Sequence, residues 1–166
     1  MAKVIYTLGN DISTDIIYPG RYMATVLPTE TPQFAFADIK DLSDLLKSKQ
    51  VPAGSIIVGG KNFGCGSSRE QAVSALKGYE LIIVAKNFAR IFLQNSINLG
   101  LQTVTCPTLE AVNGDSVEIT PTAVVNTTSG KSFPVVPLPK ARQAIVEAGG
   151  LIPYTRKRLL AKAEAS

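Results

Sequence analysis

The stretch GGKNFGCGSSREQA, residues 59–72, decides the fold because it joins an apolar run to a helical pattern through a glycine-rich turn. The run before it, SIIVGG (55–60), is rich in β-branched residues and ends in glycines. After it, apolar residues recur at roughly helical spacing until Gly78, at Ala72, Val73, Ala75 and Leu76. The pattern predicts a strand, a tight loop and a helix in that order.

Ser67 and Glu70 stand three residues apart at the start of the expected helix. This spacing is typical of a capping box, in which each side chain bonds to a backbone N–H that the first turn leaves free. The remaining N–H groups and the positive end of the helix dipole would then face an anion above Gly64, Gly66 and Ser68. A well-capped helix after a glycine turn, with no ligand, is the alternative.

Arg69 is electrostatically misplaced in a first helical turn, because a cation there opposes the helix dipole. We therefore expect a negative group beside it. The glycines on either side of Cys65 indicate either positive φ angles or a close approach of the backbone to another molecule. Cys65 itself either lines a site or is a tolerated small residue.

The next segments continue the alternation of strand and helix. LIIVAKN (81–87) is typical of a buried strand, FARIFLQNSINLG (88–100) of a helix that Gly100 ends, and LQTVTC (101–106) of another strand. This β-α-β-α-β order predicts an α/β fold with a parallel or mixed sheet flanked by helices.

The outer segments are less regular. The opening predicts a short strand, a polar turn over 9–15 and a Pro19-Gly20 turn, followed by an irregular loop (26–37) and a short amphipathic helix (39–49). From 109 onward, turn signals at Asn113-Gly114 and Ser129-Gly130 separate β-branched segments, which predicts a small β meander or hairpin. Residues 140–162 predict a helix that ends at Gly149-Gly150, then an extended or helical tail. No linker interrupts residues 1–166, so we expect one domain.

Bulk composition excludes several classes of protein. The net charge is +4, and the clearest basic cluster, Arg156-Lys157-Arg158, lacks interleaved aromatic residues, which favours a solvated tail over a nucleic-acid surface. No apolar run approaches the roughly 20 residues that cross a bilayer. The first residues also lack the long apolar segment of a secretory signal. We expect a cytoplasmic protein that binds neither membrane nor nucleic acid.

The chain contains no histidine, which removes Ser-His-Asp catalysis, His-based zinc sites and the commonest general base. Its two cysteines, Cys65 and Cys106, match neither a CxxC pair nor a four-ligand metal site. They are also too few for an iron–sulfur cluster, so no metal site is expected in this chain. Cys106, before Pro107, is interpreted as a small core residue.

Three motifs in order, DISTDIIYPGRYM, GKNFGCGSSREQA and KNFARIF with SINLGL, resemble the swivelling domain of the aconitase superfamily. The similarity is greatest to the small subunits of the 3-isopropylmalate dehydratase and homoaconitase type. The resemblance implies a swivelling β/β/α domain and a hydro-lyase subunit that is inactive without its large subunit. That partner would hold a [4Fe–4S] cluster, this chain no cofactor, and the substrate would be a small di- or tricarboxylate. For 3-isopropylmalate the reaction belongs to leucine biosynthesis.

The resemblance also implies roles for single residues. Ser67 would be the catalytic base, an alkoxide that removes a proton from the carbon α to a carboxylate. Ser68 and Arg69 would bind a substrate carboxylate, and Gly64, Cys65 and Gly66 would form the supporting loop. Asp15 matches an active-site aspartate, although a turn-forming role is an alternative. Arg90 matches a family arginine for which packing or interdomain pairing competes with substrate contact.

Selectivity would depend on Tyr22, Met23, Ala24 and Thr25, since this loop separates isopropylmalate from homoaconitate in archaeal-type relatives. Ala24 is apolar, which favours 3-isopropylmalate, with homoaconitate or 2,3-dimethylmalate as alternatives. Gln71 replaces a histidine of many relatives. A non-catalytic phosphate- or nucleotide-binding module is the rival of another class, but the loop has neither P-loop spacing nor a GxGxxG pattern. A diverged regulatory domain would be expected to lose Ser67 or Arg69.

Overall fold

The computed structural model describes residues 1–166 and contains one seven-stranded sheet in the order β4-β3-β2-β1-β5-β6-β7. Four strands are parallel: β1 (Ala2–Thr7), β2 (Ile56–Gly59), β3 (Ile82–Ala85) and β4 (Gln102–Thr105). The other three are antiparallel: β5 (Ser116–Ile119), β6 (Ala123–Asn126) and β7 (Lys131–Pro134). The expected α/β fold with a mixed sheet and flanking helices is confirmed.

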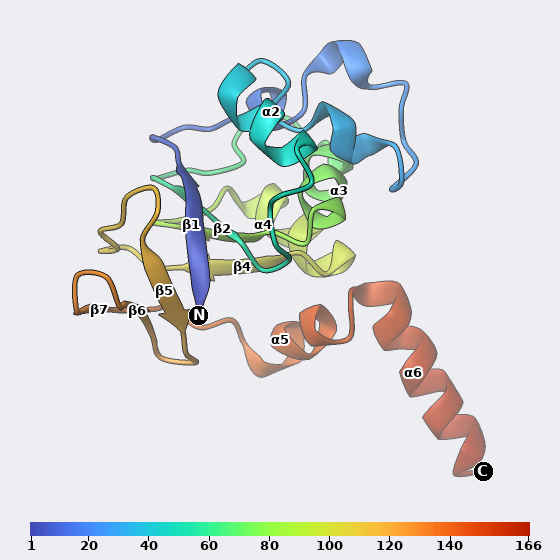
Figure 1. Ribbon diagram of the computed structural model, residues 1–166. Coiled ribbons are helices and arrows are strands. Elements are labelled where there is room, and N and C mark those ends of the chain that lie inside the picture. The colour runs from blue at the N-terminus through green and yellow to red at the C-terminus, as the bar shows by residue number, and fades with distance from the viewer.

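The central parallel strands, β2 and β3, are buried on both faces. Ile57 and Ile83 point into a core that includes residues of the helices α3 (Glu70–Gly78) and α4 (Arg90–Leu99). Their neighbours Ile56 and Val84 face a second core, shared with Val117, Val124 and Phe133 of the antiparallel strands. Helices therefore cover one face and the meander lies against the other, as Figure 1 shows, and this gives the expected β/β/α layering.

The remaining helices connect or extend these layers. They are α1 (Thr14–Ile17), α2 (Lys40–Lys47), α5 (Lys140–Glu147), α6 (Leu151–Glu164), and the 3-10 turns η1 (Gly20–Tyr22) and η2 (Thr31–Phe34). The turn η2 lies within the stretch 26–37 that was expected to be irregular. Of the two alternatives for the tail, the structure has the helical one, and α6 projects from the body (Figure 1). None of the helices combines the length and the apolar character needed to span a bilayer.

The predicted capping box is wrong. Helix α3 begins at Glu70 with Arg69 at the N-cap position, and no side chain caps it. Ser67 lies too far from the first turn, and its hydroxyl instead contacts the hydroxyl of Thr14. The N–H groups at the start of α3 are therefore left without a side-chain partner, which bears on the site described below.

Candidate active site

The site forms where the loops after β1 and β2 meet. The N–H of Thr14 donates to the carbonyl of Cys65 at 2.8 Å, and the N–H of Gly64 donates to the carbonyl of Ile12 at 2.7 Å. Both loops follow the carboxyl ends of neighbouring parallel strands, which is where open α/β sheets place their ligands. The structure thus brings together the Ser13-Thr14-Asp15 and Gly64–Arg69 motifs, which are about 50 residues apart in the sequence.

The glycines of this loop have the backbone geometry that the sequence indicated. Gly64 has a φ of 82° and Gly66 a φ of 98°, both in the left-handed region. A Cβ at Gly64 would also overlap the ring of Phe92, which is buried against it, whereas a Cβ at Gly66 would meet Thr14 only at ordinary contact distance. Between them Cys65 is half-buried and free. The path of the loop therefore requires glycine at Gly64 and favours glycine at Gly66.

Ser67 and Thr14 form a hydroxyl pair at the centre of the site. Their Oγ and Oγ1 atoms are 3.2 Å apart, and Thr14 Oγ1 also donates to the carbonyl of Ser67 at 3.1 Å. Because Thr14 carries only one hydroxyl proton, it accepts from Ser67 while it donates to that carbonyl. Rotation of this hydroxyl would turn Thr14, which is only 2% exposed, into a donor toward an ionised Ser67.

The backbone adds unpaired donors at the same place. The N–H groups of Ser67, Ser68 and Arg69 donate to no protein atom. They precede a helix of nine residues, whose N-terminus carries a partial positive charge. Converging free N–H groups at a helix N-terminus form a binding site for an anion such as a carboxylate. The lost capping box is thus consistent with a site whose partner is a ligand.

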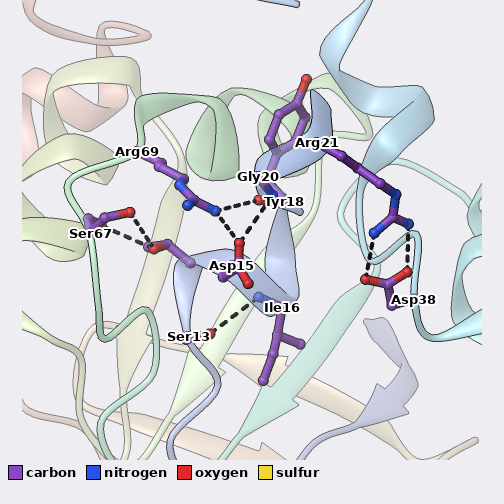
Figure 2. Close-up of polar contacts among 10 residues, drawn as sticks. Ser13, Asp15, Ile16, Tyr18, Gly20, Arg21, Asp38, Ser67 and Arg69 are labelled. Atoms are coloured by element: carbon purple, nitrogen blue, oxygen red, sulfur yellow. Dashed lines mark hydrogen bonds and ion pairs between the residues drawn. The ribbon is translucent and has the colours of Figure 1, made fainter. Parts of the chain in front are cut away.

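Arg69 is fixed from one side by Asp15 (Figure 2). Nη1 of Arg69 pairs with Oδ1 of Asp15 and donates to the carbonyl of Tyr18 at 3.2 Å. The N–H of Gly20 donates to the same Asp15 oxygen at 3.0 Å. The Arg69 hydrogen bond, followed by that of Gly20, lowers the pKa of Asp15 below its ordinary value. Nη2 of Arg69 makes no hydrogen bond to the protein, so the guanidinium is oriented and still able to bind.

A pocket of about 600 Å³ lies over these groups. Of the residues expected to catalyse the reaction or bind substrate, four line it: Met23, Ser67, Ser68 and Arg69. Asp15 lies behind Arg69 as its ion-pair partner. The glycines and Cys65 do not line the pocket but shape the loop that carries Ser67.

The loop over 22–25 contributes less directly than expected. Tyr22 stacks on Phe34 with ring centroids 4.1 Å apart, Thr25 accepts the hydroxyl of Tyr18 through its carbonyl, and Ala24 is exposed. None of these three lines the pocket in this chain. Arg21 forms a two-bond pair with Asp38, at 2.5 and 3.0 Å, on the side away from Ser67 (Figure 2).

Sequence reasoning missed several residues of the site. Val26, Pro28, Ser74 and Leu99 line the pocket. So do two residues that were noted in the sequence without a role in the site, Glu70 and Gln71, and Nε2 of Gln71 donates to the carbonyl of Met23 at 3.4 Å. Nδ2 of Asn95 donates a hydrogen bond to the carbonyl of Ser68 at 3.3 Å. Thr14 could have been found, since it stands between Ser13 and Asp15 in a motif already singled out. Leu99 could not, because only the packing of α4 beside α3 brings it there.

Cluster ligands are not grouped in this chain. No set of three histidine, cysteine, aspartate or glutamate side chains lies close enough to hold a metal ion. Cys106 is buried as expected, and burial raises the pKa of its thiol. A [4Fe–4S] cluster, which needs three or four thiolates, does not fit these residues.

Comparison with known proteins agrees with this fold. The chain belongs to the aconitase C-terminal domain family, whose model matches residues 11–109. It is 40% identical over 92% of its length to the 3-isopropylmalate dehydratase small subunit of Methanosarcina mazei, covering 94% of that protein. It is also 42% identical to the isopropylmalate/citramalate isomerase small subunit of Methanocaldococcus jannaschii, with 93% of each chain covered.

A solved structure also matches almost the whole chain. The crystal structure of 3-isopropylmalate dehydratase from Methanocaldococcus jannaschii superimposes with a TM-score of 0.88 at 38% identity. The match covers 99% of this chain and 98% of the other. The shared fold therefore includes the antiparallel strands and α6, which lie beyond the residues that the family model matches.

Proposed function

We propose that this chain is the small subunit of a 3-isopropylmalate dehydratase, a hydro-lyase that interconverts 2- and 3-isopropylmalate by dehydration and rehydration. One observation carries the proposal: Ser67, Ser68 and Arg69 share a pocket with unpaired N–H groups. The names of relatives about 40% identical over more than nine-tenths of the chain support the same reaction. The whole chain, 1–166, acts as one domain in this proposal.

Ser67 is proposed as the base. As an alkoxide it takes the proton from the carbon α to a substrate carboxylate, and the electron pair forms a C=C bond as hydroxide leaves. Rehydration returns the proton from the Ser67 hydroxyl. A serine is a weak base in water, but unpaired N–H groups, the α3 N-terminus and a donor hydroxyl on Thr14 all stabilise its ionised form once water is excluded.

Arg69 is proposed as the carboxylate ligand, together with Ser68. Its planar guanidinium can make two parallel hydrogen bonds to a carboxylate, which lysine cannot. Asp15 fixes the side chain from behind, so little side-chain entropy is lost when substrate binds. In this role Asp15 orients the ligand rather than transferring a proton.

The substrate is proposed to be an alkyl-substituted malate. Met23, Val26 and Leu99 give the pocket an apolar wall and no cation besides Arg69. Burial of a second, distal carboxylate there would be costly without a positive partner. The pocket thus favours isopropylmalate, and the citramalate of a relative's name has the same chemistry with a smaller alkyl group. Tyr22, Ala24 and Thr25 would shape the rest of the site when the large subunit is bound.

The partner is proposed to be a large subunit in the cytoplasm that carries the [4Fe–4S] cluster. This chain has no ligand set for such a cluster, so the ligands would come from that subunit. When bound, the cluster supplies a Lewis acid for the substrate hydroxyl. No nucleic acid or membrane takes part.

Reconstitution tests the proposal. The purified chain is mixed with the cluster-bearing large subunit of the same organism, and the unsaturated intermediate of 3-isopropylmalate is followed by its ultraviolet absorbance. We expect turnover from the mixture and none from either subunit alone. Turnover by this chain without its partner, or none from the intact mixture, would contradict the proposal. A phosphate-binding module would instead bind inorganic phosphate tightly and leave the mixture inactive.

A further inference from the structure

Helix α6 presents an apolar face with nothing on it. Ile152, Leu159 and Leu160 are 72%, 63% and 59% exposed, and no residue of the helix is buried. Together with Leu151, Thr155 and Arg156 they form one shallow surface. A monomer rarely leaves such a contiguous face open to water unless the face binds something.

The direction of α6 is fixed by the body of the protein. Lys77 Nζ donates to the carbonyls of both Leu99 and Gly149, at 2.8 Å in the second case, and so ties the start of α6 to α3 and α4. At the same junction a Cβ on Gly100 would overlap the carbonyl of Gly149. The partly buried Lys77 contacts and the close approach of Gly100 to Gly149 indicate a helix held in one orientation rather than a loose tail.

The root of α6 lies next to the candidate active site. Leu99, whose carbonyl Lys77 holds, also lines the pocket that contains Ser67 and Arg69. A subunit that closes this pocket must cover the rim at Leu99, and the adjoining surface along that rim is the start of α6. The apolar face of α6 is therefore continuous with the surface that the proposed function already assigns to the large subunit.

Charge limits which partner can bind there. Helix α6 has four cations, Arg156, Lys157, Arg158 and Lys162, against Glu164 alone. Its net charge of +3 compares with +4 for the whole chain, so the other residues together carry only +1. Two copies that paired through α6 would bring these cations together, whereas a surface rich in carboxylates would attract them.

We infer that α6 binds in a groove of the large subunit that has an apolar floor and an acidic rim. The inference rests on the proposed function, because it names the contact by which the same partner is held. Leu159 and Ile152 lie on the floor of the groove, and Lys157 and Arg158 face its rim. The helix anchors the subunits beside the site, and the groups that act on substrate lie elsewhere.

Titration of the large subunit with the full chain and its variants tests this contact. Leu159→Glu should raise the Kd for the large subunit at least about tenfold, the usual effect of losing a central apolar contact. The double variant Lys157→Glu/Arg158→Glu should also weaken binding and reduce its salt dependence. At saturating large subunit, both should keep the native kcat. Val112→Glu, a similarly exposed apolar residue before β5, is the matched control and should bind normally.

Other results would overturn the inference. A Kd within twofold of native for both α6 variants, with the native complex active, would overturn it while leaving the proposed function intact. Failure of the native chain to bind the large subunit would overturn both. A dimer of the chain alone that Leu159→Glu dissolves, or binding to anionic vesicles that replaces binding to the subunit, would assign the face to another occupant. Thermal unfolding of each variant checks that it folds.

Discussion

Arg69 and Asp15, 54 residues apart in the sequence, form an ion pair that joins the N-cap of α3 to the first turn of α1. The sequence predicted a negative group near Arg69 because a cation opposes the dipole of the helix that follows it. That prediction is confirmed, and the pair explains how a guanidinium stays beside three unpaired N–H groups. Substitution of Asp15 and substitution of Arg69 should therefore have different consequences.

Asp15→Asn should change how stability depends on pH. The folded-state pKa of Asp15 lies below its ordinary value of 3.8, so its ionisation stabilises the native state above that value. This contribution is lost as pH falls below 3.8 and through the lower folded-state pKa. The native chain should therefore be more stable than Asp15→Asn at neutral pH, and the difference should narrow below about pH 4. Urea unfolding from pH 7 to pH 3 measures it, and a constant difference would contradict the assignment.

Arg69→Lys should weaken substrate binding in the reconstituted enzyme. Lysine keeps the charge but loses the paired geometry, which costs about 1.5–3 kcal/mol for charge-assisted hydrogen bonds. Steady-state kinetics should show a higher KM and a lower kcat/KM. Arg21→Lys is the matched control, since Arg21 is bound to Asp38 on the side away from the pocket. Equal effects of both variants would show that Arg69 does not contact the substrate.

Ser67→Ala should lower kcat by about two to four orders of magnitude with little change in KM, as expected for the loss of a positioned general base. Thr14→Val keeps the shape of Thr14 and removes the hydroxyl that contacts Ser67 Oγ. It should lower kcat less than Ser67→Ala does, while Thr14→Ser should restore most activity. Near-native kcat in Ser67→Ala would rule out the proposed base.

The sequence predicted most of the fold because its strands and helices have strong local signals. The run 55–60 and the helix after it are both present as β2 and α3. The meander is confirmed in β5, β6 and β7, although Asn113-Gly114 precedes β5 and only Ser129-Gly130 joins two strands. The capping box failed for a tertiary reason, since Thr14 competes for the Ser67 hydroxyl and S-x-x-E alone cannot show this.

Pocket residues were harder to predict than motif residues. Ser67 and Arg69 stand in a glycine-rich loop with an evident signal, whereas Val26 and Leu99 are ordinary apolar residues in sequence. They join the site only because the loop over 23–28 folds against α3 and because α4 packs beside it. Their role depends on long-range packing, which no local pattern encodes.

Two glycine variants should separate steric overlap from backbone strain. Gly64→Ala combines a positive φ with overlap against buried Phe92, so we expect it to unfold the chain or to destabilise it by more than about 3 kcal/mol. Gly66→Ala has only the positive φ, which costs on the order of 1–2 kcal/mol. Denaturant unfolding compares them, and equal losses would show that Phe92 can move aside.

The last prediction concerns which side group the pocket accepts. Met23 and Val26 form its apolar wall, while Ala24 is exposed and Arg21 is held by Asp38. A substrate with an alkyl group fits this wall, whereas one with a distal carboxylate needs a cation to offset burial of its charge. We expect the reconstituted native enzyme to prefer 3-isopropylmalate or 2,3-dimethylmalate over homoaconitate.

Ala24→Arg and Val26→Arg should each shift this preference toward homoaconitate, by as much as about 1–3 kcal/mol in relative kcat/KM if the new guanidinium meets the distal carboxylate. Competition assays with both substrates measure the shift. If only Val26→Arg has an effect, the apolar wall of this chain determines the substrate preference, since Val26 lines the pocket and Ala24 does not. An effect of Ala24→Arg would show that the large subunit moves the loop over 22–25 into contact with substrate. A native preference for homoaconitate would mean that a cation outside this wall, Arg21 freed from Asp38 or a residue of the large subunit, sets the selectivity, and Arg21→Ala distinguishes these two sources.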